Sequence, residues 1–288
     1  MKIIMSKYLS YCSGVSSAMQ KMYNSIQWGK ENNKKVYSLG NLIHNNRAIQ
    51  KLNDLGVIVL EEKDIATAIP GIIVLRAHGV RDDLLRWILK KGFIVVDATC
   101  PIVIQEQNFI KEADKKYHIV IIAKKNHPEA EFLYSVETSH TKSLVSDVAD
   151  LDNLENEKPL FVVMQSTFPL TMAKVIYEKL YKLKNDKREV VIANSPCAST
   201  KRRQIEIEAL SKSTDCIIVI GGENSSNTNS LKLHAENFGK PVYRINSKEE
   251  IPHSLLGVKR IGIATGTSTP TFIIDEILET LRGAYSET

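Results

Sequence analysis

Three of the four cysteines divide the chain into near-equal thirds. Cys12, Cys100 and Cys197 are separated by 88 and 97 positions in a chain of 288 residues. Polar loops follow each cysteine at two similar distances, and these loops contain His44, His78, His127, Glu129, Ser166, Thr167, Ser225, Ser226, Asn227 and Ser268. A threefold repeat of this kind brings three thiols and a ring of hydrogen-bonding groups to one axis. The pattern therefore indicates a metal cluster that faces a small polar substrate.

The composition is that of an ordinary globular protein, with 43% hydrophobic and 25% charged residues. No run of 18 or more apolar residues occurs, and Met1 leads directly into Lys2. We therefore expect no membrane span and no signal or transit peptide, and a cytoplasmic location, or the plastid stroma in an organelle-bearing source. The net charge of +5 is spread along the chain, and clusters such as Lys201-Arg202-Arg203 are typical of solvated helix faces. No nucleic-acid partner is predicted.

The fourth cysteine, Cys216, differs from the other three in its surroundings. It lies in the apolar run from Asp215 to Gly222, which predicts a buried strand. Four cysteines without an export signal also argue against a disulfide framework. We therefore interpret Cys216 as an inert core thiol.

Short apolar runs alternate with amphipathic helical stretches, which is typical of parallel β-α-β construction with helices on both faces of each sheet. The predicted strands are Val57–Leu60, Ile72–Leu75, Phe93–Val96, Ile119–Ala123, Leu160–Met164, Val190–Ala193, Ile217–Ile220 and Ile261–Ala264. One predicted helix begins after Cys12. The other predicted helices cover Asn45–Leu55, Asp82–Lys91, Leu170–Leu183, Lys201–Leu210, Ser226–Phe238 and Thr271–Leu281.

The polar residues of the loops stand just past the carboxyl ends of predicted strands, where open parallel sheets bind ligands. We therefore predict an α/β fold of three small parallel-sheet domains around a shared centre. The expected limits are 1–98 with Cys12, His44 and His78, 99–195 with Cys100, His127, Glu129 and Ser166, and 196–288 with Cys197, Ser225, Asn227 and Ser268.

Two kinds of metal site are compatible with the three cysteines. Structural zinc sites gather ligands in close C-x₂₋₄-C pairs, and this sequence has none. An iron–sulfur cluster held by three thiolates leaves one iron without a protein ligand, which can act as a Lewis acid toward a substrate oxygen. The spacing alone does not distinguish iron from zinc.

The cysteines and polar loops lie in short motifs along the chain. They are Cys12-Ser-Gly-Val15, Leu42-Ile-His-Asn45, Ala77-His-Gly79, Asp97-Ala-Thr-Cys-Pro101, His127-Pro-Glu129, Gln165-Ser-Thr167, Cys197 with Arg203-Gln204, Asn224-Ser-Ser-Asn-Thr228 and Ser268-Thr-Pro270. Together these motifs resemble those of the 4-hydroxy-3-methylbut-2-enyl diphosphate reductase family of the non-mevalonate isoprenoid pathway. The resemblance runs in order from Cys12 to Pro270, and Asp-Ala-Thr-Cys-Pro and Asn-Ser-Ser-Asn-Thr are its specific signals.

The resemblance implies a trefoil of three α/β domains with pseudo-threefold symmetry around one [4Fe–4S] cluster per chain, ligated by Cys12, Cys100 and Cys197. It implies that the substrate hydroxyl binds the fourth iron. That hydroxyl then leaves as water with two electrons and two protons, giving isopentenyl and dimethylallyl diphosphate. A ferredoxin or flavodoxin is implied as electron donor, and we expect a monomer or a homodimer.

The loop residues suit this chemistry. The expected substrate-binding residues are His44, His78, His127, Ser166, Thr167, Ser225, Ser226, Asn227 and Ser268. Ser225 and Ser226 also suit helix capping, and the helix N-terminus there favours an anion. Glu129 is the only carboxylate in these loops, and we assign it proton delivery to the leaving hydroxyl, with Ser166 as relay and His127 as a further catalytic residue. Taken alone, Glu129 would be interpreted as an exposed residue at a helix start.

Several departures mark the chain as a divergent member. Ser10-Tyr11 stands where the family usually has Gly-Phe, and Ile104, Gln105 and Gln107 replace Thr, Lys and His. Phe132 lies in a stretch where the family usually has Val-x-Gly-Thr-x-Gly. Two alternatives therefore stay open. One is an iron–sulfur reductase for another allylic or phosphorylated substrate, and the other is a non-enzymatic iron–sulfur redox protein.

Overall fold

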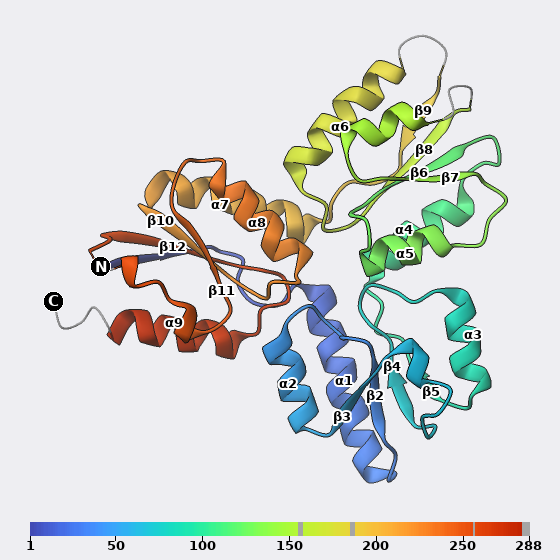
Figure 1. Cartoon of the computed structure of the whole chain (residues 1–288), viewed down its shortest axis with the longest axis horizontal. Helices are drawn as coiled ribbons and strands as arrows, with labels where there is room; N and C mark the ends of the chain where they lie inside the picture. The colour runs from blue at the N-terminus through green and yellow to red at the C-terminus, as the bar shows by residue number, and fades with distance from the viewer. Residues whose placement is uncertain (155–157, 185–187, 256, 284–288) are drawn as a thin grey trace. The chain divides into compact units, whose positions relative to one another are not determined.

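The structure, a computed structural model, describes residues 1–154, 158–184, 188–255 and 257–283. Strands and helices alternate along this part of the chain (Figure 1). The chain divides into two compact units. The first comprises Met1–Val15, Ile43–Lys51 and Ala198–Thr288, and the second comprises Ser16–Leu42 and Leu52–Cys197. No helix in the described ranges combines the length and apolar character needed to cross a membrane.

The first unit contains one parallel sheet of four strands, in the order β1-β12-β10-β11. The strands are β1 (Lys2–Met5), β10 (Cys216–Ile220), β11 (Val242–Ile245) and β12 (Arg260–Thr265). Ile3 of β1 lies opposite Ile261 of β12, so the sheet joins strands from far-separated parts of the sequence. This unit contains α7 (Ala198–Ser213), α8 (Ser226–Glu236), α9 (Thr271–Gly283) and the larger part of α2 (Asn46–Asp54).

The second unit contains two parallel sheets of four strands each (Figure 1). One sheet has the order β3-β2-β4-β5, and its strands are β2 (Val36–Leu39), β3 (Val57–Leu60), β4 (Ile72–Val74) and β5 (Ile94–Val96). The other has the order β7-β6-β8-β9, and its strands are β6 (His118–Ile122), β7 (Lys142–Val145), β8 (Leu160–Met164) and β9 (Val190–Ile192).

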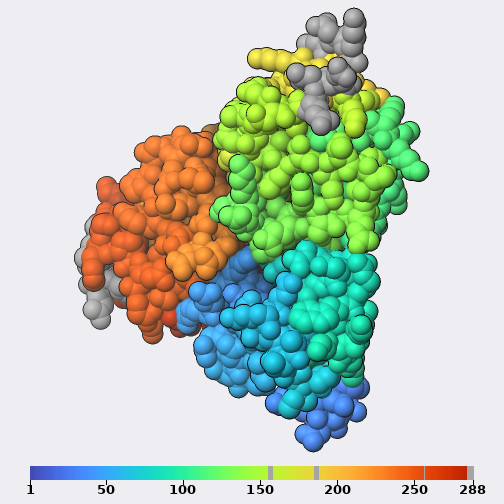
Figure 2. All heavy atoms as spheres, turned by 45° about the vertical axis from the view of Figure 1, so that its right-hand side comes forward, coloured from blue at the N-terminus to red at the C-terminus, as the bar shows by residue number. Residues whose placement is uncertain are grey.

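In the part of the chain that the structure describes, six α-helices lie between Ser13 and Leu183. They are α1 (Ser13–Glu31), α2 (Asn46–Asp54), α3 (Asp82–Lys90), α4 (Pro101–Glu112), α5 (Pro128–Ser135) and α6 (Leu170–Leu183). Short 3₁₀ helices cover Glu62–Asp64, Val148–Asn153, Lys248–Glu250 and His253–Leu255. Figure 2 shows one closely packed face of the second unit, whose atoms are coloured from cyan to green there.

The central strands are buried on both faces because helices cover both sides of each sheet. Along β6, Val120 and Ile122 pack into one apolar cluster, and Ile119 and Ile121 pack into another. This alternation follows the two-residue period of a strand. It explains why the predicted strands are continuous apolar runs rather than alternating ones.

The three sheets share one strand order. In both sheets of the second unit, the first strand along the chain lies between the second and the third, and the fourth lies at the edge. The sheet of the first unit has the same order, with β1 in the place of the fourth strand. The predicted α/β class with three parallel sheets is therefore confirmed. The domain limits 1–98, 99–195 and 196–288 remain a prediction, and the strand partner of β1 lies in the last of these ranges.

All eight predicted strands and all seven predicted helices are present, with ends that differ by a few residues. The sequence analysis did not predict the strands β1, β2, β7 and β11 or the helices α4 and α5.

Candidate active site

Each of the three predicted ligand cysteines stands directly before a helix. Cys12 precedes α1, Cys100 is the N-cap of α4, and Cys197 precedes α7. All three side chains are half-buried, and none of the four cysteines forms a disulfide. Backbone N–H groups at a helix N-terminus favour negative charge, and the Val15 N–H donates to Cys12 Sγ at 3.5 Å. These positions suit thiolate ligands.

The backbone of each cysteine is held in the same way. The N–H of Cys12 donates to the Thr267 carbonyl at 3.1 Å, that of Cys100 to the Ala77 carbonyl at 2.9 Å, and that of Cys197 to the Ser166 carbonyl at 2.8 Å. The accepting residues lie in the loops that follow β12, β4 and β8. The three cysteines are thus equivalent within the repeat, as their spacing in the sequence predicted.

Cys216 lies in the core, as expected. Its side chain is buried in β10 among the isoleucines of the first unit. Burial, with a contribution from Asp215, raises the pKa of the Cys216 thiol to about 11. Cys216 therefore remains a protonated thiol near neutral pH and does not suit a metal site.

Glu129 lies in the first turn of α5, but its side chain is only 1% exposed. The interpretation of Glu129 as an exposed helix-start residue is therefore wrong. The Ser166 N–H donates to its Oε1 at 2.5 Å, and the Ser166 hydroxyl donates to its Oε2 at 2.9 Å. Burial raises the pKa of Glu129, while the hydrogen bonds from Ser166 oppose the rise. The pair has the geometry for moving a proton between a carboxyl and a hydroxyl group.

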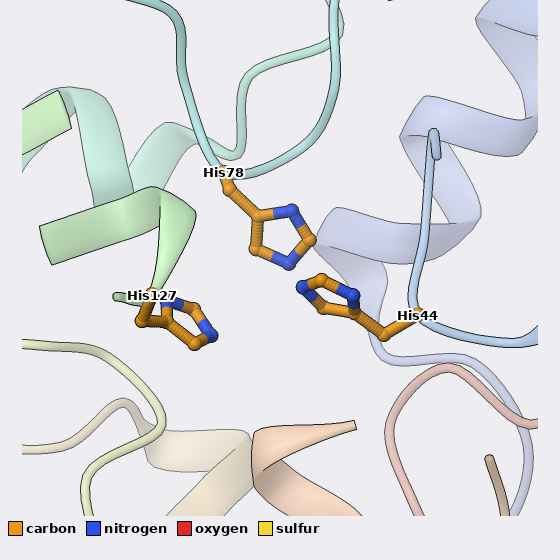
Figure 3. Close-up of side chains that lie close together, drawn as sticks. All are labelled: His44, His78 and His127. Carbon is orange, nitrogen blue, oxygen red and sulfur yellow. The ribbon is translucent and has the colours of Figure 1, made fainter. Parts of the chain in front are cut away.

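His127 and His78 meet in the second unit. His127 is the N-cap of α5, and its Nδ1 accepts a hydrogen bond from the Glu129 N–H at 3.1 Å. An accepting Nδ1 carries no proton, so in the neutral ring the proton is on Nε2. The His78 ring, from the loop after β4, meets the His127 ring edge to face, with centroids 5.6 Å apart (Figure 3).

Polar side chains also converge in the first unit. Ser225 is the N-cap of α8 and accepts from the Thr228 N–H at 3.2 Å. The Ser268 hydroxyl donates to the His44 carbonyl at 3.1 Å and lies 3.4 Å from the Ser225 hydroxyl. Asn227 Oδ1 accepts from the Thr267 N–H at 3.0 Å. The first unit therefore brings together His44, Ser225, Asn227 and Ser268.

Ser226 and Thr167 are the two remaining predicted binding residues. Ser226 is the first residue of α8 and is half-buried. Thr167 Oγ1 accepts from Gln165 Nε2 at 2.9 Å, and Gln165 Oε1 accepts from the Lys124 N–H. The predicted site residues are divided between the units: the first holds Cys12, His44, Ser225, Ser226, Asn227 and Ser268, and the second holds His78, Cys100, His127, Glu129, Ser166, Thr167 and Cys197.

Arg203 supports the loop that carries Cys12. It is 4% exposed and donates to the carbonyls of Tyr8 and Ser10 at 2.8 and 2.7 Å. It also donates to the Thr265 carbonyl at 2.7 Å. Ser10 has a φ of 62°, in the left-handed region that favours glycine, which gives a physical reason for the glycine usual in the family.

Phe132 occupies space in front of Gly79. Its buried ring belongs to the apolar cluster under α5, and a Cβ placed on Gly79 would lie 2.6 Å from that ring. Gly79 also has a φ of 85°. The loop that carries His78 therefore requires glycine at position 79, both for its backbone and for its contact with Phe132.

One buried carboxyl group near Glu129 was not predicted from the sequence. Glu106, in α4, is 1% exposed, and burial together with the neighbouring Glu129 raises its pKa well above the ordinary value. Glu129 is therefore not the only carboxylate at this place. A signal was present, because Val103, Glu106 and Ile110 share the buried face of one helix, and a glutamate within an apolar stripe needs a partner.

These features define an α/β protein with three equivalent half-buried cysteines and a buried carboxyl group held by a serine. The sequence profile of the LytB protein family matches residues 3–282. The chain belongs to the LytB protein family.

Relatives named 4-hydroxy-3-methylbut-2-enyl diphosphate reductase support this assignment. The one from Caldanaerobacter subterraneus subsp. tengcongensis is 33% identical, covering 100% of this chain and 99% of its own. The one from Clostridium perfringens strain 13 is 34% identical, covering 97% and 98%.

Two solved structures are also similar. The E-1-hydroxy-2-methyl-but-2-enyl-4-diphosphate reductase from Plasmodium falciparum has a TM-score of 0.89 and 26% identity, covering 98% of this chain and 88% of its own. A structure of (E)-4-hydroxy-3-methyl-but-2-enyl diphosphate reductase, described as the terminal enzyme of the non-mevalonate pathway, has a TM-score of 0.71 and 28% identity, covering 98% and 100%.

Proposed function

We propose that this chain is a 4-hydroxy-3-methylbut-2-enyl diphosphate reductase, which converts its substrate into isopentenyl and dimethylallyl diphosphate. The proposal rests on the equivalent setting of Cys12, Cys100 and Cys197, each before a helix and each anchored to a strand-end loop. The reaction takes up two electrons and two protons, and the hydroxyl group leaves as water.

The cysteines fit an iron–sulfur cluster better than a structural zinc ion. Three thiols in matching positions leave one metal coordination place without a protein ligand, whereas structural zinc sites are closed by four. Cys216, buried and held as a thiol, is not a fourth ligand. Cys12, Cys100 and Cys197 would hold a [4Fe–4S] cluster, which supplies electrons and a Lewis-acidic iron when bound.

Glu129 is the residue that delivers a proton to the leaving hydroxyl group. Its carboxyl group is buried, and burial keeps the pKa above its ordinary value. Ser166 fixes both carboxyl oxygens, so the group has one orientation. The Ser166 hydroxyl is also placed to relay the proton, and His127 is fixed beside Glu129 by the hydrogen bond at its Nδ1.

Neutral donors and histidines bind the diphosphate in this proposal. His44, Ser225, Asn227 and Ser268 converge in the first unit, and the N-terminus of α8 adds backbone N–H groups and a favourable dipole. Donors from the second unit are also assigned to the substrate. They are His78, His127, Ser166 and Thr167; Ser226 completes the set at the start of α8.

The electrons come from a small one-electron donor protein, a ferredoxin or a flavodoxin. A net charge of +5 suits association with an acidic donor of this kind. The active form is a monomer or a homodimer.

The first test is the Mössbauer spectrum of anaerobically reconstituted protein, with and without 4-hydroxy-3-methylbut-2-enyl diphosphate. We expect one iron of the cluster to change its signal on addition of the substrate. Cys197→Ser should impair cluster assembly, and Cys216→Ser, the matched control, should not. A cluster that depends on Cys216 would overturn the ligand assignment.

A second candidate is an iron–sulfur reductase for another allylic or phosphorylated substrate. It is favoured by Phe132, whose ring fills the space next to Gly79 in a stretch where the family usually has glycine. Turnover under strict anaerobiosis distinguishes the two functions. The reductase for another substrate would be supported if the cluster spectrum does not change on addition of 4-hydroxy-3-methylbut-2-enyl diphosphate and the protein does not turn this compound over.

A further inference from the structure

Helix α4 places an acidic side chain on its apolar face. Val103, Glu106 and Ile110 are the buried residues of this helix, and Glu106 is as deeply buried as the isoleucine and valine beside it. A carboxyl group buried in this way is costly unless it is neutral or hydrogen-bonded. Its contacts therefore decide its chemical state.

One oxygen of Glu106 is an acceptor. Asn194 Nδ2 donates to Glu106 Oε1 at 3.1 Å. The orientation of the Asn194 amide is fixed by the backbone of Met164, whose N–H donates to Asn194 Oδ1 at 2.7 Å and whose carbonyl accepts from Nδ2 at 2.8 Å. Asn194 therefore presents an N–H group, and not its oxygen, to Glu106.

The other oxygen of Glu106 is buried and accepts no hydrogen bond from a donor among the described residues. The carboxyl groups of Glu106 and Glu129 are both buried and lie close enough to act on each other. Two neighbouring buried carboxyl groups cannot both be charged at low cost, so such a pair favours a proton on one of them. Both oxygens of Glu129 accept from Ser166, which favours the carboxylate form of Glu129 and therefore the acid form of Glu106.

The electrostatics agree with this assignment. Burial, together with the neighbouring Glu129, raises the pKa of Glu106 well above its ordinary value. The hydrogen bonds from Ser166 and Glu106 act in the opposite direction on the pKa of Glu129. Cys197 and Cys100 act on the pKa of Glu106 in the same direction, because a nearby thiolate favours the neutral carboxyl group.

We propose that Glu106 and Glu129 form a carboxylic acid–carboxylate pair that holds one proton, and that Glu106 passes this proton to Glu129 during turnover. The transfer of the proton from Glu106 to Glu129 rests on the proposed function. The O–H bond of Glu106 breaks as an O–H bond forms on Glu129, and the leaving hydroxyl receives a proton from Glu129 to give water. The relay moves only protons, since the one-electron donor protein supplies the electrons. The two carboxylates left behind repel each other, so the pair takes up a proton from solvent.

Glu106 is thus a positioning residue that acts through Glu129. Glu106→Gln tests this role because a glutamine can accept from Asn194 and donate to Glu129 but has no proton to transfer. The matched control is Glu112→Gln, on the exposed face of the same helix. Glu106→Asp keeps a carboxyl group and serves as the conservative variant.

The first measurement is the infrared spectrum of the reconstituted protein in H₂O and D₂O. We expect a carbonyl band of a protonated carboxyl group that shifts in D₂O, is lost in Glu106→Gln and remains in Glu112→Gln. No such band in the wild type, or its persistence in Glu106→Gln, would overturn the pair whatever the activity. This result does not depend on the substrate, so it is separate from a failure of the proposed function.

The second measurement is anaerobic turnover across a pH series. We expect Glu106→Gln to lower kcat about 10-fold to 100-fold with little change in KM, and Glu106→Asp to recover part of the loss. The pH dependence of kcat should also change in Glu106→Gln, which a merely structural role would not produce. Wild-type kcat and pH profile in a Glu106→Gln protein that has lost the infrared band would overturn the relay.

Discussion

At the scale of single residues, the neighbours of a carboxyl group decide what it can do. Glu129 and Glu131 stand two positions apart in α5, yet Glu129 is buried against Ser166 and Glu131 is exposed. Both glutamates lie in the first turn of the helix, so the local sequence does not show which of the two is buried. The contact with Ser166, in the loop after β8, holds the Glu129 carboxyl group in the buried position that the assigned proton delivery needs.

Replacing Glu129 by glutamine should leave the cluster intact and lower kcat by about 10²-fold to 10⁴-fold, because the amide has no proton to deliver. Glu131→Gln is the matched control and should behave as the wild type. The measurements are turnover and the cluster absorbance of the same anaerobic samples. Turnover that survives in Glu129→Gln would remove this residue from the mechanism.

At the scale of elements, strands such as β6 and β10 were easier to predict than the edge strands β7 and β11 or the helices α4 and α5. Strands such as β6 and β10 are continuous apolar runs, and parallel sheets bury such runs on both faces. The strands β7 and β11 escaped prediction because they are short, half-buried and contain charged residues. Their places at sheet edges explain this composition.

Helix α4 shows why part of the site was missed. Its first turn, Pro101-Ile-Val-Ile, is rich in β-branched residues, which have low helix propensity. The helix forms because proline suits the first helical position and because Val103 and Ile110 pack under it. Because this helix was not predicted, the helical spacing of Val103, Glu106 and Ile110 was not recognised as a buried face.

The loop after β4 and helix α5 depend on each other at Gly79. Gly79→Ala should destabilise the fold by about 2–4 kcal/mol, because it adds backbone strain and a clash with Phe132. Gly56→Ala is the control for strain alone, since Gly56 has a φ of 94° and no atom within 4 Å of the added Cβ. It should cost about 1 kcal/mol. Chemical denaturation measures both, and equal losses would show that the contact with Phe132 contributes nothing.

At the scale of the whole molecule, stability should depend on pH through the Glu106–Glu129 pair. The pKa of Glu106 in the folded protein is raised well above the ordinary value of 4.5. Above that value the unfolded chain ionises while the folded protein keeps its proton, so stability falls as pH rises. Urea denaturation between about pH 5 and about pH 8 should show this fall in the wild type and a smaller one in Glu106→Gln. Parallel curves for the two proteins would contradict the raised pKa.

The threefold repeat was predicted from three cysteines, and its three sheets are present. The spacing did not reveal that the third sheet takes its fourth strand from the start of the chain. Strand β1 completes the sheet of β10, β11 and β12. A four-residue strand with one lysine, one methionine and two isoleucines carries too little pattern to indicate its partner. Strand pairing over such a sequence distance is a property of the folded molecule.

The pairing of β1 with β12 has a consequence for biosynthesis. A ribosome releases β1 and Cys12 early, but Thr267, whose carbonyl binds the Cys12 N–H, emerges only after β12. The two cysteine positions anchored by Ala77 and Ser166 have their partners much sooner. Cys12 is therefore the last of the three to reach its final setting. Until translation has passed β12, the Cys12 thiol has to stay reduced and without another ligand or disulfide partner if it is to bind the cluster.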